Sequence, residues 1–230
     1  MSREMVLAPA LRPIVSPRAP VVDRDGAGLF AGCPELIGTP AAYGREEEIF
    51  GEGEEAESVY RVLQGAVRTH KVLSDGRRQI TGFHLPGDLF GFEPGETHRH
   101  TAEALTGTRA LVFKRRQVER LATHRAEVAC QLWSFATRSL RHAQDHMLLL
   151  GRRSALERVA AFMLDVDERL GGTGLFDLPM TRRDIADYLG LTIETVSRTI
   201  SQLEGEGALL RTGGRQVSLR RGRMHRLVED

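Results

Sequence analysis

Cysteine is nearly absent from the chain. Its 230 residues include two cysteines, Cys33 and Cys130, which are far apart and form no Cys-x-x-Cys pair. Such a chain has too few thiolates for a cysteine-based structural zinc site or for an iron–sulfur cluster held by four thiolates. We therefore expect each cysteine to pack as a small apolar residue, and a redox role for either one remains a second interpretation.

Long hydrophobic runs are missing as well. No stretch of eighteen apolar residues occurs, so no membrane-spanning helix is predicted. The opening sequence MSREMVLAPALRPIVSPRAPVV is interrupted by prolines and arginines and lacks the apolar core of a signal peptide. Residues 1–25 are therefore predicted to form a flexible N-terminal arm, and a cytoplasmic location is expected.

The chain also lacks a strong net charge, and it has little lysine. The formal net charge is +1, and Lys71 and Lys114 are the only lysines among 32 Lys and Arg residues. A GC-rich genome explains this bias most simply, whereas a role for arginine in gripping phosphate or guanine needs local support. Residues 180–226 contain nine arginines and five acidic residues. This local excess of positive charge is of the kind that a nucleic-acid-binding surface needs, even when the whole chain is nearly neutral.

The first half of the chain has the pattern of short β-strands. The segment ESVYRVLQGAVRTHKV alternates apolar and polar residues, and Ser74-Asp75-Gly76 supplies a turn before RRQITGFHL. Further turns are expected at Pro86–Asp88 and Glu93–Glu96, and glycines recur throughout. Residues 26–115 are therefore predicted to form a small antiparallel β-roll.

The next segment, residues 116–150, is predicted to be a long helix. An apolar seam spaced alternately three and four residues apart runs along it, with no charged residue. The seam comprises Trp133, Ala136, Leu140, Ala143, Met147 and Leu150. The seam either packs on the chain's own β-roll or joins two copies in a parallel homodimer, and we favour the dimer, formed without any ligand.

Residues 151–230 are predicted to form a winged helix-turn-helix. Thr181 and Asp184 have the spacing of a capping box, Gly190 allows a sharp turn, and Thr192 caps a second helix that runs to about Glu204. The following segment GALLRTGGRQVSLRR reads as two short strands, the wing. The predicted fold class is thus α+β, with a β-roll, a long helix and a winged helix-turn-helix.

The outer face of the second helix carries the chemistry for reading DNA. An arginine there grips guanine O6 and N7, a glutamate accepts from cytosine N4, and a serine contacts a base edge. The predicted base-contacting residues are Glu194, Ser197 and Arg198. The predicted phosphate-contacting residues are Thr181, Arg182, Thr192, Thr195 and Arg215. The simpler alternative for Glu194 and Arg198 is an i, i+4 ion pair on a solvated helix face.

These residues resemble the CRP/FNR family of bacterial transcription regulators. The resemblance covers most of the chain and is strongest in QDHMLLL, ERVAAFMLDVDERL and LPMTRRDIADYLGLTIETVSR. Glu194, Ser197 and Arg198 match the E-x-x-S-R pattern of the FNR-like branch, which implies recognition of a palindrome close to TTGAT-N4-ATCAA. The resemblance also implies an activator that recruits RNA polymerase through exposed roll loops, such as the one around Asp75–Arg78, and that has no enzymatic activity.

The sensory half departs from the best-known members of the family. The CRP type binds the ribose of its nucleotide with a Gly-Glu-Leu sequence, but here Gly91 is followed by Phe92, and Glu93 comes one residue later. At the two positions where the CRP type has Arg-Ser for the phosphate, this chain has His100 and Thr101. The cysteine cluster of the FNR type is absent. The chain therefore resembles the FixK branch, which implies control of microaerobic respiration, denitrification or nitrogen-fixation genes with no cofactor and no metal.

Two alternatives involve histidine. The segment HRHTAE, which contains His98, His100 and Glu103, resembles the metal-binding motif of cupin enzymes, because imidazoles at i and i+2 of a strand point the same way. His142 and His146 lie one helical turn apart and are read either as metal or haem ligands or as polar residues beside the seam. A regulator that responds to haem, nitric oxide or another small ligand is the alternative within the family.

Overall fold

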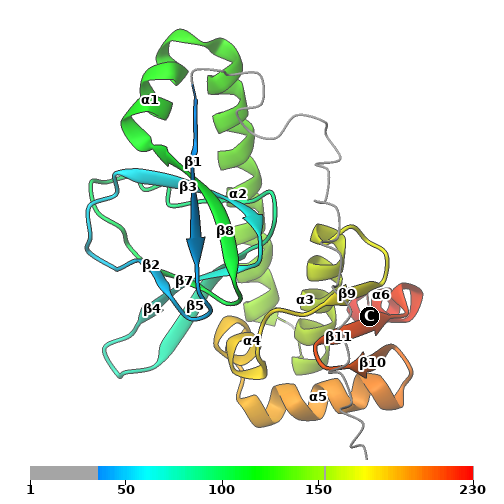
Figure 1. The fold of residues 1–230 in the computed structure, drawn as a ribbon. Coiled ribbons are helices and arrows are strands. Elements are labelled where there is room, and N and C mark those ends of the chain that lie inside the picture. Colours follow the sequence, from blue (N-terminus) through cyan, green and yellow to red (C-terminus); the bar gives the residue numbers. More distant parts are fainter. Residues whose placement is uncertain (1–35, 153, 230) are drawn as a thin grey trace, which may run out of the picture.

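The structure, a computed structural model, describes residues 36–152 and 154–229. The predicted N-terminal arm, residues 1–25, and Cys33 lie outside the described residues. Within the described part, no helix is long and apolar enough to cross a membrane. A β-roll and a mixed α/β unit lie on either side of a long helix (Figure 1).

The β-roll consists of two four-stranded antiparallel sheets, with strand orders β1-β8-β3-β6 and β2-β7-β4-β5. The strands are β1 (Thr39–Tyr43), β2 (Glu48–Phe50), β3 (Ser58–Gln64), β4 (Val67–Val72), β5 (Arg78–His84), β6 (Leu89–Phe90), β7 (Thr101–Ala104) and β8 (Thr108–Lys114). The predicted turn at residues 74–76 joins β4 to β5. Gly76 has φ 80° there, and the Asp75 carboxylate accepts a hydrogen bond from the Arg77 backbone at 3.0 Å.

The helix expected at residues 116–150 is two helices in the structure, α1 (Arg115–His124) and α2 (Ala126–Arg152). Arg125 between them is extended, with φ −124° and ψ 106°. The break has a packing reason. Val118 and Val128 both enter one apolar cluster with strand residues of the roll, whereas a continuous helix would hold them about 15 Å apart.

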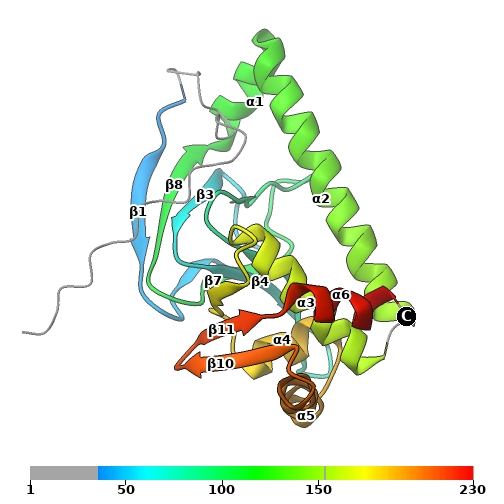
Figure 2. The same cartoon turned by 90° about the vertical axis from the view of Figure 1, so that its right-hand side faces the viewer.

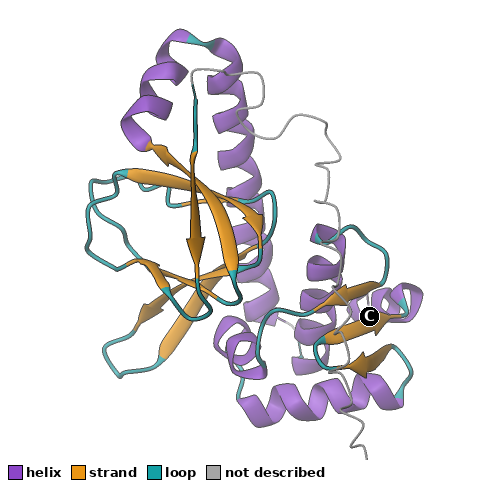
Figure 3. Ribbon diagram, in the orientation of Figure 1, coloured by secondary structure: helices purple, strands orange, loops and turns teal. Residues whose placement is uncertain are grey.

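The C-terminal part has the expected winged helix-turn-helix and one further helix. Its elements are α3 (Ala155–Arg169), β9 (Leu175–Asp177), α4 (Arg182–Leu189), α5 (Ile193–Gly205), β10 (Leu209–Gly213), β11 (Gln216–Leu219) and α6 (Arg221–Glu229). The three strands form a sheet in the order β10-β11-β9, and α4 and α5 are the two helices of the turn motif (Figures 2 and 3). The predicted fold class is confirmed. The last helix, α6, was not anticipated by the sequence analysis.

The core of the C-terminal part extends into the β-roll. One continuous cluster of buried apolar residues includes Ile185, Leu189 and Val196 of the helix-turn-helix together with Ile80 and Phe83 of β5. Strand β5 packs against α4 through these residues. The helix-turn-helix is therefore seated on the roll as well as on its own sheet.

Candidate nucleic-acid interface

The first helix of the turn motif, α4, begins with a complete capping box. The Thr181 hydroxyl accepts from the Asp184 backbone at 3.1 Å, and Asp184 Oδ2 accepts from the Thr181 backbone at 2.9 Å. The Thr181 hydroxyl also donates to the same Oδ2 at 2.6 Å. The box satisfies backbone donors that the first turn would otherwise leave unpaired, so the start of α4 is set locally.

The turn between the helices depends on one glycine. Gly190 closes α4 in the left-handed region, with φ 63° and ψ 39°, a conformation in which a Cβ would be strained. Two residues later, Thr192 caps α5 by accepting from the Thr195 backbone at 3.1 Å. The predicted glycine turn and both predicted caps are present, so α5 leaves α4 at a defined angle.

The first turns of α5 carry the predicted base-contacting residues on their outer side. Glu194 and Arg198 are exposed and Ser197 is half-buried, while Val196 and Ile200 on the opposite side are buried in the core. In the described part of the chain no ion pair joins Glu194 to Arg198. The simpler reading of this i, i+4 pair as a closed surface bridge is therefore not what the structure shows.

The charge of Glu194 is secured by its surroundings. Hydrogen bonds from its own backbone N–H and from the Thr192 hydroxyl hold the pKa of the Glu194 carboxyl below its ordinary value, with Arg198 and Arg183 adding to the effect. The carboxylate is therefore an acceptor at neutral pH, which is the form needed to meet a cytosine amino group.

The predicted phosphate-contacting residues surround this face, but not all of them are free to donate. Arg182 donates to Ser197 Oγ at 3.2 Å, and Arg215, next to the wing turn, donates to the Pro179 carbonyl at 3.2 Å. Both are weakly held at the surface and exposed. Thr181 differs, because its N–H and its hydroxyl both donate to Asp184, so its hydroxyl has to change partner to reach a phosphate.

The predicted seam on α2 lies on the surface of the single chain. Trp133 is 76% exposed, Leu140 60% and Met147 65%. Ala136 and Ala143 are exposed as well, and Leu150 is half-buried. The roll contacts a different face of α2, through Leu132 and Phe135. The seam thus remains available to a second copy, and the alternative that it packs on its own β-roll does not apply.

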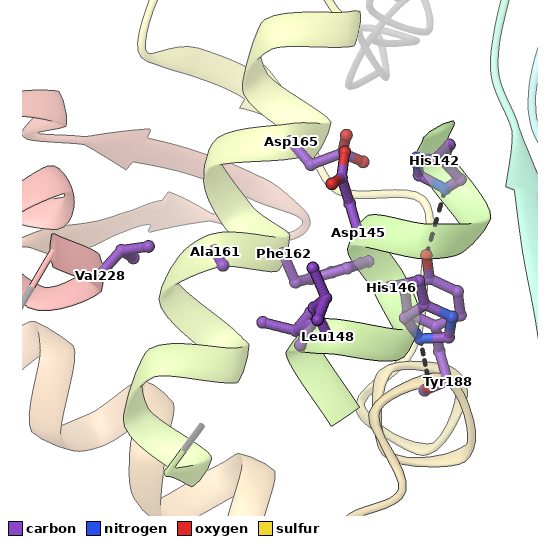
Figure 4. Close-up of a pocket in the computed structure, with 10 residues that line it drawn as sticks. His142, Asp145, His146, Leu148, Ala161, Phe162, Asp165, Tyr188 and Val228 are labelled. Carbon is purple, nitrogen blue, oxygen red and sulfur yellow. Dashed lines mark hydrogen bonds between the residues drawn. The ribbon is translucent and has the colours of Figure 1, made fainter. Parts of the chain in front are cut away.

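His142 and His146 face α4 and not the seam. The His146 ring stacks on Tyr188 at 4.0 Å and donates to the Tyr188 carbonyl at 3.0 Å, and His142 Nε2 lies 3.3 Å from the Tyr188 hydroxyl. They line a cavity of about 310 Å³ where α2, α3 and α4 converge (Figure 4). Burial lowers the pKa of His146, so it is neutral in this contact. The two histidines join helices, which accounts for them without a metal or haem.

The interior of the roll is filled by aromatic side chains near the positions where the sequence departs from the ribose clamp of the CRP type. Phe50, Tyr60 and Phe90 stack on one another in its interior with ring centroids 5.0–6.1 Å apart. A Cβ at Gly91 would lie 2.8 Å from the Tyr60 ring. Glu93, which stands near the expected ribose position, accepts from the Arg99 backbone. The aromatic packing and the engaged Glu93 carboxylate do not fit the clamps by which the CRP type binds a cyclic nucleotide.

The cupin-like motif does not assemble either. His98 and His100 lie in an irregular segment before β7, so the prediction that they lie on a strand is wrong, and the alternation of a strand does not align their imidazoles. His98 stacks on Phe50 at 3.6 Å, and Glu103 accepts from Arg68. Among the residues that the structure describes, no group of three His, Cys, Asp or Glu side chains is arranged to hold a metal ion.

Comparisons with known proteins agree with this architecture. Residues 157–227 match a family described as the Crp-like helix-turn-helix domain, and residues 40–125 match one described as the cyclic nucleotide-binding domain. The nitrogen fixation regulation protein FixK of Azorhizobium caulinodans is 48% identical over 204 residues, which cover 86% of this chain and 82% of the relative.

Two further similarities are informative. The transcriptional activatory protein AadR of Rhodopseudomonas palustris is 48% identical over 176 residues, which cover 75% of this chain and 74% of AadR. The structure of FixK2 from Bradyrhizobium japonicum matches this one with a TM-score of 0.80 and 55% identity, over 84% of this chain and 98% of the other. The similarity therefore includes the roll, the long helix and the winged helix-turn-helix together.

Proposed function

This chain belongs to the CRP/FNR family of transcription regulators, and from that premise we propose that it is a homodimer that reads a palindrome close to TTGAT-N4-ATCAA. Its relatives are regulators and not enzymes, in agreement with the sequence analysis. Its own branch is FixK-like, since two FixK proteins and FixK2 are among the similar proteins.

The observation that carries the proposal is the outer face of α5. Arg198 projects from the second turn without an ion-pair partner in the described residues, which leaves its guanidinium available for guanine O6 and N7. Glu194, ionised and one turn earlier, accepts from cytosine N4. Ser197 lies between them and contacts a neighbouring base edge.

The predicted phosphate contacts hold α5 in register on the duplex. Arg182 at the start of α4 and Arg215 beside the wing supply charge, and Thr192 and Thr195 supply hydroxyls at the start of α5. Thr181 joins them only by giving up its bond to Asp184. These contacts supply affinity without sequence preference, and their contribution is expected to decrease with salt.

Dimerisation follows from the exposed seam of α2. In the single chain, Trp133, Leu140 and Met147 of α2 are more than half exposed, and a second copy would remove this apolar area from water. The dimer presents two copies of α5 to two half-sites, which is why a palindrome is expected. Because the seam is uncharged, the dimer is proposed to form without a ligand, with no cofactor.

The regulatory role is proposed from the relatives. FixK proteins are named for regulation of nitrogen fixation and AadR as a transcriptional activatory protein. We assign this chain a similar role as a cytoplasmic activator of microaerobic respiration, denitrification or nitrogen-fixation genes. Recruitment of RNA polymerase is proposed to use exposed roll loops such as the turn at Asp75–Arg77, where Arg77 is 78% exposed in its side chain.

The direct test is binding of purified full-length protein to a labelled TTGAT-N4-ATCAA duplex, followed by fluorescence anisotropy with no ligand added. A scrambled duplex of equal composition is the control. The expected result is preference for the palindrome on the order of 10³-fold or more. Equal affinity for both duplexes would overturn the proposed sequence recognition.

A further inference from the structure

A buried group of charged side chains joins the β4–β5 hairpin of the roll to α4. Arg68 on β4 donates from Nη1 to Asp184 Oδ1 at 2.8 Å, and these side chains are 9% and 1% exposed. Glu103 on β7 also binds the Arg68 guanidinium. Its Oε2 accepts hydrogen bonds from Arg68 Nε at 3.1 Å and from Arg68 Nη2 at 2.7 Å. The planar guanidinium is therefore fixed on the roll side and directed at the helix.

Arg78 on β5 makes the second connection. Its Nε donates to Asp187 Oδ2 at 2.9 Å, and its Nη2 donates to Asp184 Oδ1, also at 2.9 Å. Asp184 and Asp187 are three residues apart and share one face of α4. A single rigid guanidinium that spans two carboxylates on one helical turn specifies both the direction of the helix and its rotation about its axis.

Asp184 takes part both in the contacts from the roll and in the capping box of α4. Its Oδ1 accepts from both arginines, while its Oδ2 completes the capping box with Thr181. Buried ion pairs contribute little net stability compared with apolar packing, but the loss of one partner leaves a buried charge uncompensated. We therefore expect this group to contribute little to the net stability of the fold but to disfavour any placement of α4 that separates Asp184 from the two arginines.

Tyr188, one helical turn after Asp184, also holds α4. Tyr188 contacts Phe83 of the hairpin at 5.0 Å between ring centroids, and it contacts His142 and His146 of α2. Helix α4 is thus located between the roll and α2, and it packs directly against α5 through the Gly190 turn (Figure 1). The placement of α5 relative to α2 follows from that of α4.

We propose that Arg68 and Arg78 are positioning residues for DNA recognition, which set the separation and relative rotation of the two recognition helices in the dimer. This inference rests on the proposed function, because separation has meaning only for a dimer on two half-sites. Each base pair added between half-sites moves them about 3.4 Å apart and turns one about a tenth of a helical turn relative to the other. A firmly docked α4 therefore confers a strict preference for one spacing.

The experiment compares Arg78→Met with Arg77→Met in the full-length protein. Arg77 is the neighbouring residue in the chain and is exposed, and among the described residues its side chain pairs only with Asp75 of its own turn. Affinities are measured for duplexes whose half-sites are separated by three, four, five or six base pairs, and for a scrambled duplex. Thermal unfolding and sedimentation velocity establish that each variant is a folded dimer.

The expected result is that Arg78→Met lowers the preference for the best spacing over its neighbours by about fivefold or more. Its preference for the half-site sequence over the scrambled duplex at that spacing stays larger than one. Arg77→Met keeps the wild-type spacing profile, since the assay contains DNA and no RNA polymerase. An unchanged spacing profile in folded Arg78→Met would overturn the inference. If that variant does not fold, Asp187→Asn is measured in its place, and an unchanged profile there overturns the inference equally.

Failure of the proposed function has a different signature. A wild-type protein that does not distinguish the palindrome from the scrambled duplex refutes the proposed recognition before any variant is considered. A wild-type protein that is selective for sequence but indifferent to spacing refutes the positioning role alone.

Discussion

Trp133 and Phe135 are two residues apart on α2 and face opposite environments. The Phe135 ring packs against Phe92 of the roll with centroids 5.5 Å apart, whereas Trp133 is 76% exposed. The helix therefore has two separate apolar faces, and the roll covers only one. This arrangement is the structural basis for the proposed dimer, and it locates the residues at which dimerisation can be disrupted.

Ala143→Asp is expected to weaken the dimer. Ala143 is exposed in the single chain, so the aspartate costs the monomer little, but it puts two carboxylates across the seam of the dimer. Like charges in an interface cost several kcal/mol, which corresponds to roughly 100-fold or more in the dimer dissociation constant. Sedimentation velocity at micromolar concentration measures this, with Ser134→Asp as the control because Ser134 is exposed on α2 outside the seam. A fully dimeric Ala143→Asp protein would show that another face is used.

Arg198→Ala is expected to cost about 1–3 kcal/mol of specific binding, because a bidentate contact to guanine is lost. The loss is measured by anisotropy on the palindrome and on a duplex changed at the guanine position. The variant is expected to bind both nearly alike. Arg77→Ala removes the same charge from the roll and serves as the control. Retention of both affinity and selectivity by Arg198→Ala would refute its assignment to base recognition.

Arg215→Ala is expected to weaken binding to all sequences by a similar factor. Its contact is proposed to be with phosphate, so the slope of log K against log salt concentration decreases by about 1 for each arginine, or about 2 for the dimer. A salt titration of the wild type, Arg215→Ala and Arg215→Lys measures the slope, and the lysine variant keeps the charge and most of the slope. A loss confined to the palindrome would instead place Arg215 against a base.

His84→Gln is expected to reduce the sensitivity of stability to acid. Burial is the main cause that lowers the pKa of His84 to about 4, so the folded protein holds this imidazole neutral while the unfolded chain protonates it near 6.5. The unfolded state therefore binds more protons between these values, and the contribution of His84 is complete above about pH 6.5 and is lost as the pH falls toward 4.

Glutamine keeps a neutral side chain near the Thr69 hydroxyl, which lies 3.2 Å from His84 Nε2, but it cannot titrate. Urea unfolding at pH 7, 6 and 5 measures the difference in free energy of unfolding between wild type and variant. The difference is expected to shift in favour of the variant as the pH falls. A difference that does not change with pH would mean that His84 titrates alike in both states.

Much of the helix-turn-helix was predictable from the sequence because its determinants are local. The capping pair Thr181 and Asp184, the glycine at position 190 and the cap at Thr192 each act within a few residues, and each was found as expected. The outward face of α5 follows from helical periodicity once its start is known. Local hydrogen bonding and steric allowance thus determine the motif before any distant contact is made.

Other features were decided by tertiary packing. The helix breaks at Arg125 because Val118 and Val128 both pack into one apolar cluster with the roll. No glycine, proline or other turn residue at this point of the sequence predicts the break. His142 and His146 were placed beside the seam by periodicity, but the side of α2 they occupy has meaning only once Tyr188 is packed there. Periodicity describes the faces of a helix without saying what covers each one.

The sequence by itself determined the order of the elements, the caps, the turn glycines and the chemistry of the recognition helix, since these depend on neighbours in the chain. Only the tertiary structure brought Arg68 and Arg78 to Asp184, across more than a hundred residues. In the sequence, Arg68 and Arg78 look like ordinary polar residues of an alternating strand, and nothing near them indicates their partners. Their partners are chosen by how the roll and the helix-turn-helix fit together, and that fit depends on burial and charge in three dimensions.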